Sequence, residues 1–329
     1  MNTMSSRSPR LLLVLALAFL AFDCNRLKLS EYPDAVVDVI RLEDIIEMEA
    51  TCAAISPDGK KLYVGSCCSD RIAVLSTASD SVTRCIGGVG PSRDMCISPD
   101  GKELYVLACS SLVKVLPVAD SSARATILLP DHAMELALDP SGRYLYVSQS
   151  SRDQDYIYRL DIASLTITDT ASLSCWVSEM ELTPNGRYLC LSCWGEEEWV
   201  KLVNTSTMTV ECESTDIPAM GIAVSPDSKR LYCACEDYVS AHSLPYLKEL
   251  GRVEVEAADL VRAMPGGDYV YTASTAWEDE CVYIVRTSDM SIVRYLWYQY
   301  WEDIEFTPDG SSAYLVYGDI TKLNRSVRP

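Results

Sequence analysis

Carboxylate side chains recur at fixed distances ahead of a set of regularly spaced prolines. The residues five positions before these prolines are Cys52, Asp94, Glu135, Glu179, Gly221, Leu260 and Asp303. Two positions further on, and therefore on the same side of an extended strand, are Glu181, Arg262 and Glu305. Gathered together, these acids suit a hard cation such as calcium, and paired carboxylates also perform acid–base chemistry. The alternative is a rim of solvated charges around a water-filled channel.

Cysteine and histidine offer less chemistry. The chain has 14 cysteines and two histidines, His132 and His242. Cys190 and Cys193 have the spacing of a redox motif, but within a strand this offset points the two thiols to opposite faces, and such chemistry requires a helix N-terminus. No paired Cys-x-x-Cys sets indicate zinc. We therefore predict no metal ligands, interpret most cysteines as small buried hydrophobic residues, and leave their pairing open.

The elements that position these residues are given by an internal repeat of about 40 residues. The motif SPDGKKLYV begins at Ser56 and recurs as SPDGKELYV at Ser98, DPSGRYLYV at Asp139, TPNGRYLCL at Thr183, SPDSKRLYC at Ser225, MPGGDYVYT at Met264 and TPDGSSAYL at Thr307. Proline, Asp or Asn, and glycine favour a tight turn between two strands. Two more β-rich segments follow each hairpin, which predicts an all-β, seven-bladed β-propeller of four-stranded antiparallel blades.

The last repeat is too short for four strands, because few residues follow Pro308. Residues 35–42 (AVVDVIRL) precede the first motif at the spacing of a fourth strand. We predict that this N-terminal strand closes the ring and removes an exposed sheet edge. The predicted domain spans residues 35–329, after a linker at residues 25–34.

The repeated x-P-D-G-x-x-L-Y-V motif resembles the YVTN-type β-propeller repeat of bacterial exported and surface proteins. The resemblance implies that the first strand of each blade lines the central channel and starts on the face that carries the loops between strands two and three. The candidate ligand-binding residues on that face are Asp94, Glu135, Glu179, Glu181, Asp303 and Glu305, with the aromatic residues Trp176, Trp194, Trp277 and Trp301. Exposed aromatic and acidic groups suit a cationic, sugar-like or protein ligand. Packing between blades is the competing interpretation of the aromatic residues.

The N-terminus is typical of a signal peptide. Arg7 and Arg10 precede the uncharged residues 11–22, a run too short to span a bilayer comfortably. Residues 20–24 (LAFDC) resemble a bacterial lipoprotein signal, in which Cys24 would be lipidated, although Asp23 stands where a small residue is preferred. We predict a signal peptide at residues 1–24 and an exported protein of the cell envelope. An uncleaved N-terminal anchor is the alternative.

Charge and repeat together favour a binding function. The formal net charge of −19 disfavours nucleic acid as a partner. We predict a monomeric, non-catalytic binding or scaffold protein that uses the loop face and channel mouth for a protein or small-molecule ligand, with calcium as the one cofactor that the acids suggest. The alternative is a hydrolase similar to the propeller lactonases, whose catalytic His and Arg signatures do not align with His132 or His242.

Overall fold

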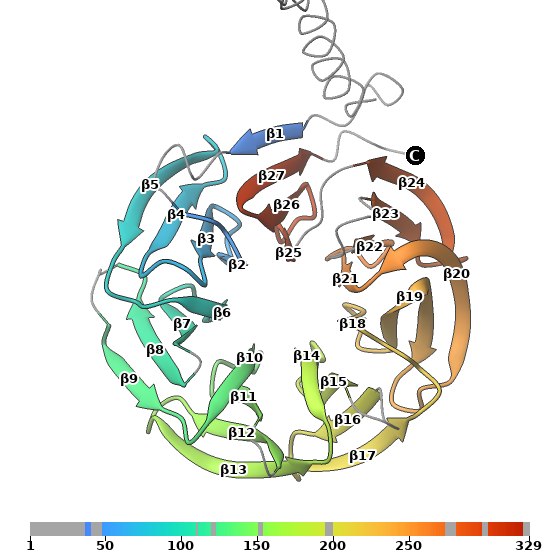
Figure 1. Cartoon of the computed structure of the whole chain (residues 1–329), viewed down its shortest axis with the longest axis horizontal. Coiled ribbons are helices and arrows are strands. Elements are labelled where there is room, and N and C mark those ends of the chain that lie inside the picture. The colour runs from blue at the N-terminus through green and yellow to red at the C-terminus, as the bar shows by residue number, and fades with distance from the viewer. Residues whose placement is uncertain are drawn as a thin grey trace, which may run out of the picture.

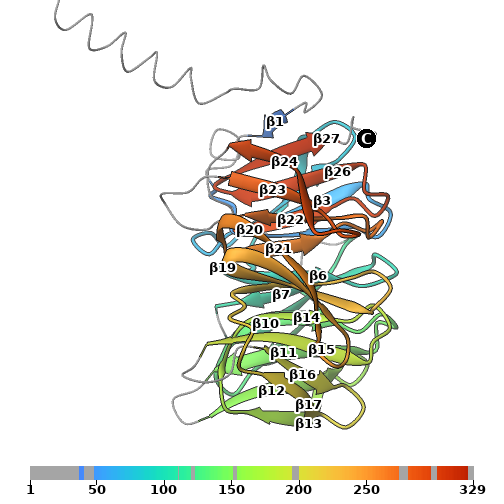
Figure 2. The same ribbon diagram turned by 90° about the vertical axis from the view of Figure 1, so that its right-hand side faces the viewer.

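The computed structural model describes residues 37–40, 48–109, 111–119, 123–150, 154–194, 200–273, 281–297 and 302–324. Seven antiparallel sheets are arranged in a ring, seen along its axis in Figure 1. In Figure 2 the ring is seen edge-on, and its strands run roughly along the axis. The fold is a seven-bladed β-propeller, which confirms the fold class predicted from the repeat.

The first four blades each contain four strands in chain order, from the innermost to the outermost. Blade 1 is β2 (Cys52–Ile55), β3 (Lys61–Gly65), β4 (Ile72–Ser76) and β5 (Ser81–Ile86). Blade 2 is β6 (Ser92–Ile97), β7 (Glu103–Ala108), β8 (Leu112–Pro117) and β9 (Ala125–Leu128). Blade 3 is β10 (His132–Leu138), β11 (Tyr144–Ser150), β12 (Asp155–Asp161) and β13 (Thr166–Leu173). Blade 4 is β14 (Trp176–Leu182), β15 (Tyr188–Trp194), β16 (Val200–Asn204) and β17 (Thr209–Ser214).

Blade 5 has the same plan, with its middle strands merged. It consists of β18 (Gly221–Val224), β19 (Arg230–Ser243) and β20 (Glu249–Ala258). The first half of β19 pairs with β18 and the second half with β20. The Leu244 N–H donates to the Lys229 carbonyl oxygen at 2.8 Å, and Glu236 has a φ of 49°. We conclude that β19 folds back on itself and supplies two of the four strands.

The last two blades complete the ring. Blade 6 is β21 (Leu260–Ala263), β22 (Tyr269–Ala273), β23 (Cys281–Arg286) and β24 (Ser291–Trp297). Blade 7 has β25 (Asp303–Phe306), β26 (Ser312–Tyr317) and β27 (Asp319–Asn324), with β1 (Val37–Ile40) as its outermost strand. Because β1 pairs antiparallel with β27, the predicted closure by an N-terminal strand is confirmed. The Lys322 ammonium group of blade 7 also lies 2.8 Å from the Asp80 carboxylate of blade 1.

The repeated motif forms the turn between the first two strands. In blade 2 the Gly101 N–H donates to the Ser98 carbonyl oxygen at 2.8 Å, and the φ of Gly101 is 69°, a value that favours glycine. The Ser98 hydroxyl donates to the Asp100 carboxylate at 2.7 Å and accepts from the Glu103 N–H at 2.9 Å. These hydrogen bonds explain why a hydroxyl residue and Asp or Asn recur around the proline.

The hydrophobic core is divided into layers between neighbouring blades. Tyr63 and Ile72 of blade 1, for example, share a cluster with Met95 and Leu104 of blade 2. Cys193 belongs to the layer between blades 3 and 4, whereas Cys190 belongs to the layer between blades 4 and 5. The two thiols of the Cys-x-x-Cys spacing therefore lie on opposite faces of their blade, as the strand offset predicts.

Candidate functional site

The innermost strands surround the axis of the ring (Figure 1) and carry the acidic positions singled out in the sequence. We call the central cluster the set Asp94, Glu135, Glu179, Glu181, Arg262, Asp303 and Glu305. The pairing register shifts at Asp94, between Ala133 and Leu136, and again at Glu179. Such bulges change the direction in which a side chain points and are frequent beside functional sites.

Arg262 connects three blades. From blade 6 its guanidinium forms ion pairs with Glu179 of blade 4 and, at 3.2 Å, with Asp303 of blade 7. The side chains of Arg262, Glu179 and Asp303 keep 27%, 15% and 16% of their surface exposed. Two partly desolvated ion pairs from one guanidinium are stronger than exposed ones, because the local dielectric constant is lower. Arg262 is thus the counter-ion of the cluster.

Small residues in blade 5 leave room for this connection. At the two repeat positions where its neighbours carry long side chains, blade 5 has Gly221 and Ala223, both of them buried. A Cβ atom on Gly221 would lie 2.4 Å from the carbonyl oxygen of Asp259. Glycine is therefore required at position 221, where the backbone leading into blade 6 approaches most closely.

Most of the carboxylates also fasten one blade to the next. The innermost strand of a blade is a sheet edge, whose N–H groups have no partner within their own sheet. The Asp94 carboxylate of blade 2 accepts the Leu136 N–H of blade 3 at 2.6 Å. Blade 4 acts in the same way on blade 5, since Glu179 accepts the Ile222 N–H at 2.7 Å and Glu181 accepts the Val224 N–H at 2.8 Å. Asp303 of blade 7 accepts the Ala53 N–H of blade 1 at 3.3 Å.

Glu135 differs from its neighbours in the cluster. Among the described residues no hydrogen bond reaches its carboxylate, although its own N–H donates to the Ser148 hydroxyl at 3.0 Å. Burial, with the nearby carboxylates of Asp94 and Glu179, raises the pKa of Glu135 well above its usual value. Glu135 is consequently a carboxylate of the cluster that favours a proton or a cationic group.

The cluster retains protons more strongly than free carboxylates do. Burial raises the pKa of Asp94 to about 7, although the Leu136 N–H opposes this effect. Burial raises the pKa of Glu181 to about 8, opposed by Arg262 and the Val224 N–H. Burial and then the neighbouring Asp303 raise the pKa of Glu305 well above its usual value. At neutral pH the cluster therefore carries less negative charge than its composition suggests.

These directions predict a stability that decreases as pH rises from about 5 to about 8. The folded state binds protons that the unfolded chain has already released, so the stabilisation present below the unfolded pKa is lost as pH passes through the folded pKa. Each tenfold difference in proton affinity is worth about 1.4 kcal/mol. Urea unfolding at several pH values measures the slope. Glu181→Gln should flatten it and Glu254→Gln, on the outer strand β20, should not; equal slopes would contradict the assignment.

A metal role for the cluster is a separate question. In the part of the chain that the structure describes, no group of three or more His, Cys, Asp or Glu side chains is placed to hold a metal ion. The carboxylates of Asp94, Glu179 and Asp303 are instead engaged by backbone N–H groups, and two of them also by Arg262. Calcium binding remains a prediction of the sequence.

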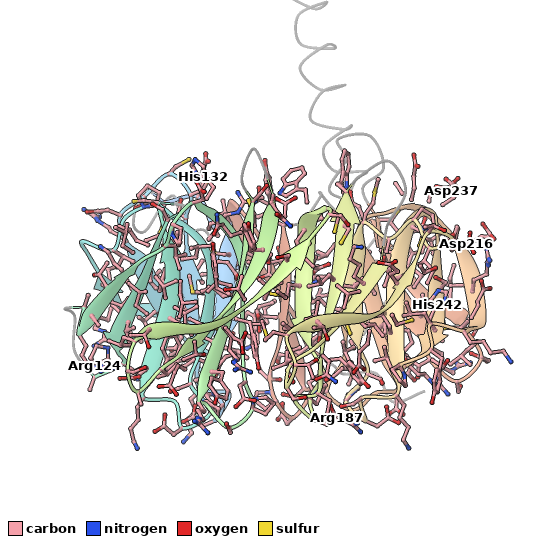
Figure 3. All side chains as sticks on the ribbon, turned by 90° about the horizontal axis from the view of Figure 1, so that it is seen from below. Arg124, His132, Arg187, Asp216, Asp237 and His242 are labelled. Carbon is pink, nitrogen blue, oxygen red and sulfur yellow. The ribbon has the colours of Figure 1, made fainter. Side chains whose placement is uncertain are left out.

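The two faces of the ring differ in charge. Because strands alternate in direction, the loops between strands two and three and the links between blades share one face, the upper face. The upper-face loops carry Glu49, Asp70, Asp131, Asp216, Glu236, Asp237, Asp259 and Glu302, with Arg71 as the one basic residue among those described. Figure 3 shows Asp216 and Asp237 on this face, together with His132, and Arg124 and Arg187 on the opposite, lower face.

Lower-face charges are balanced. Its described loops carry Asp58, Asp80, Asp100, Asp139, Asp227, Asp268, Asp289 and Asp309 against Lys60, Lys102, Arg124, Arg143, Arg187, Lys229 and Lys248. Several are paired within one turn, such as Asp100 with Lys102 at 2.9 Å. On the upper face Asp131, Asp216, Asp237 and Glu302 are exposed, and none of them forms an ion pair with a described residue. The upper face is thus a strongly acidic surface.

Two tryptophans stand at the upper edge of blade 4. Trp176 starts the innermost strand and Trp194 ends the second, and the two are directly paired across the strands. Their rings meet edge to face with centroids 6.3 Å apart, and they are 43% and 51% exposed. They are not buried between blades, which removes the packing interpretation for this pair. Trp277 and Trp301 lie outside the described residues.

The histidines are far apart in the fold. His132 is exposed on the upper face, whereas His242 is buried in blade 5 (Figure 3). The His242 ring nitrogens contact the Ser240 hydroxyl at 2.8 Å and the Leu247 carbonyl oxygen at 3.3 Å. Burial lowers the pKa of His242. These contacts satisfy both nitrogens within the core of the blade.

The predicted targeting segment is not part of the described structure. Cys24 and residues 11–22 lie outside it. Within the described residues, no helix is both long enough and apolar enough to cross a bilayer.

Comparisons with known proteins support the fold. The sequence matches no family model and no curated protein. Its structure is similar to Kuenenia stuttgartiensis hydrazine synthase, with a TM-score of 0.75 and 16% identity over 85% of this chain and 96% of that one. A chain of the mitotic checkpoint complex is similar with a TM-score of 0.75 and 13% identity, over 88% of this chain and 90% of that one. The Myceliophteria thermophila Cps50 (Swd1) β-propeller domain is similar with a TM-score of 0.73 and 14% identity, over 89% of this chain and 100% of that one. At these identities the similarity concerns the fold alone.

Proposed function

We propose that this β-propeller is a non-catalytic binding or scaffold protein whose acidic upper face and channel mouth bind a cationic protein segment. The observation that carries the proposal is the difference in charge between the two faces. A surface rich in carboxylates and poor in basic side chains attracts basic partners over distances of about 10 Å at moderate salt and repels acidic ones. Two of the similar structures, a chain of the mitotic checkpoint complex and the Cps50 β-propeller domain, share this fold, which is compatible with such a role.

The Trp176–Trp194 pair adds a short-range contact to this attraction. An exposed aromatic face binds a Lys or Arg side chain through cation–π contact, worth about 0.5–1 kcal/mol at exposed sites. Tryptophan is also frequent among residues that dominate protein interfaces. Trp176 starts β14, the strand that also carries Glu179 and Glu181, and Trp194 ends the adjacent strand β15. A basic side chain docked on the indoles would therefore approach the mouth of the central cluster.

A fluorescent oligo-arginine peptide tests the charge of the face. We expect the peptide to bind at low salt and to dissociate as sodium chloride is added. Asp131→Lys combined with Asp216→Lys should weaken binding at least about tenfold. The matched control, Asp58→Lys combined with Asp268→Lys, makes the same change in net charge on the lower face and should bind as the wild type does. Equal loss in both variants would show that only net charge matters and would contradict the proposed surface.

We further propose that the chain is an exported lipoprotein of the bacterial cell envelope, of the YVTN-repeat type. The support is the sequence alone: the charged and apolar N-terminal residues, Cys24, and the seven motifs. A lipid anchor at Cys24 would hold the ring at a membrane surface through the residues between Cys24 and β1, the first strand of the propeller.

Cys24→Ala tests the anchor. We expect the substituted protein to move from the membrane fraction to the soluble fraction, because one residue carries the acyl chains. Fractionation with immunoblotting measures the distribution, and Cys85→Ala is the control at an exposed cysteine of the propeller. Membrane association that survives the Cys24 substitution would rule out lipidation there and favour an uncleaved helix.

A further inference from the structure

Two exposed thiols lie together on the upper face of blade 1. Cys67 and Cys68 occupy the loop between β3 and β4, and their sulfur atoms are 3.5 Å apart. Four cysteines among the described residues are exposed and outside any disulfide bond: Cys67, Cys68, Cys85 and Cys109. Only the first two of these four lie next to each other in the chain. The function proposed above assigns no role to these two thiols.

The turn that carries these thiols is held in place by its surroundings. The Cys67 N–H donates to the Thr51 hydroxyl at 2.9 Å, and the Cys68 N–H donates to the Ser66 hydroxyl at 3.1 Å. The Ser66 carbonyl oxygen in turn accepts the Ser92 N–H of blade 2 at 2.7 Å. Because the backbone is fixed at both residues, the two sulfur atoms are brought together before any ligand arrives, which lowers the entropic cost of binding through both.

The geometry suits chelation better than a disulfide bond. Adjacent Cα atoms are about 3.8 Å apart across a trans peptide, below the range of about 4.4–6.8 Å that is usual for disulfides. Partial desolvation of the sulfur and the hydrogen bond with Cys68 raise the pKa of Cys67, so the thiol is a weak attacking group in thiol–disulfide exchange. A thiophilic ion that binds both sulfurs displaces their protons and does not require a sulfur–sulfur bond.

We propose that Cys67 and Cys68 form a two-sulfur chelating site for a soft, thiophilic metal or metalloid ion. Trivalent arsenic, supplied as phenylarsine oxide, is a suitable probe because it forms bonds to two thiols at once. In that step two arsenic–sulfur bonds form, the arsenic–oxygen bond breaks, and the oxygen leaves as water with the two thiol protons. No electrons are transferred, so no oxidant or reductant is needed.

The test is capture of the full-length, reduced protein by phenylarsine oxide, followed by mass spectrometry of the intact adduct and its peptides. We expect one adduct that bridges Cys67 and Cys68. Cys67→Ser and Cys68→Ser should each weaken capture by at least about 100-fold, because the second bond becomes intermolecular or is lost. Cys85→Ser and Cys109→Ser, which remove single exposed thiols, should leave capture unchanged.

Other outcomes would overturn the proposal. Capture of Cys67→Ser at wild-type affinity would place the adduct elsewhere. Protein isolated without reductant that carries a Cys67–Cys68 disulfide and no longer binds the arsenical would assign the pair to redox chemistry instead. Circular dichroism of each variant separates loss of the site from loss of the fold, since both thiols are exposed and their substitution is expected to cost little stability.

Discussion

Arg262→Gln should lower the free energy of unfolding by about 2–4 kcal/mol at neutral pH. The guanidinium contacts Glu179 and Asp303 from a third blade, and its removal leaves two partly buried carboxylates without their counter-ion. Breaking a fully buried ion pair costs about 3–5 kcal/mol, and the remaining exposure of these side chains reduces that figure. The loss should be smaller at pH 5, because burial raises the pKa of Glu179 and this carboxylate then takes up a proton in place of the missing charge.

Urea unfolding measures the effect, and the chain offers a matched control. Arg252 forms an exposed ion pair with Glu249 at 2.6 Å, with 46% and 40% of the two side chains accessible. Arg252→Gln should therefore cost less than about 1 kcal/mol. The loss in the free energy of unfolding for Arg262→Lys should lie between those for Arg262→Gln and Arg252→Gln, because an ammonium group keeps the charge but cannot form the planar contacts of a guanidinium. Equal losses at positions 262 and 252 would mean that the central cluster does not hold the blades together.

Deletion of residues 35–42 should abolish the single cooperative unfolding transition. The deletion removes β1, so β27 becomes the exposed edge of blade 7 and the ring loses its closure. An unpaired edge promotes pairing with other chains, so we expect dimers or aggregates on size-exclusion chromatography. Deletion of residues 27–34 has the same length and leaves β1 intact, so it should melt as the wild type does.

A synthetic peptide of residues 35–42 allows the same test when the deletion variant is poorly soluble. Added during refolding, the peptide should restore a soluble monomer, because it can pair with β27 in the register of Val37 with Leu323. A soluble, monomeric deletion variant with the melting temperature of the full chain would show that closure by β1 is dispensable.

The fold could be predicted from the sequence because each motif specifies its own turn. The proline, the acidic residue and the glycine act locally, as the hydrogen bonds of Ser98 and Asp100 show. The closure of the ring by an N-terminal strand could be predicted because the last repeat is too short for its fourth strand. The merged strand β19 could not be predicted, because Glu236 adopts the left-handed conformation without being a glycine and so gives no turn signal in the sequence.

The candidate site was accessible only in part. The acidic positions and Arg262 were identified by counting back from the prolines. Their hydrogen bonds to neighbouring blades and the ion pairs of Arg262 were not predicted. The distance along the chain from Asp94 to Leu136 is about one repeat, so a carboxylate that reaches the neighbouring edge N–H could have been anticipated. The reach of Arg262 across blade 5 depends on Gly221 and Ala223, which no local pattern indicates.

The charge difference between the faces was also present in the sequence, although it is hidden in a composition that is acidic everywhere. It emerges when the loops are assigned alternately to the two faces. Lower-face acids such as Asp58 and Asp227 have a lysine two residues later, at 3.5 and 3.8 Å. Upper-face acids such as Asp131 and Glu302 have no such partner among the described residues.

Zero-length carboxylate–amine crosslinking to an oligo-lysine peptide tests the binding surface most directly, because both faces offer many exposed carboxylates. Peptide mapping by mass spectrometry then reports which of them lie against the bound peptide. We predict crosslinks concentrated at Asp131, Asp216, Asp237 and Glu302, reduced by Trp176→Ala with Trp194→Ala but not by Tyr246→Ala, which removes an 81% exposed aromatic ring from the lower face. Crosslinks distributed equally over the upper-face residues and the lower-face Asp58, Asp100 and Asp309 would contradict the account.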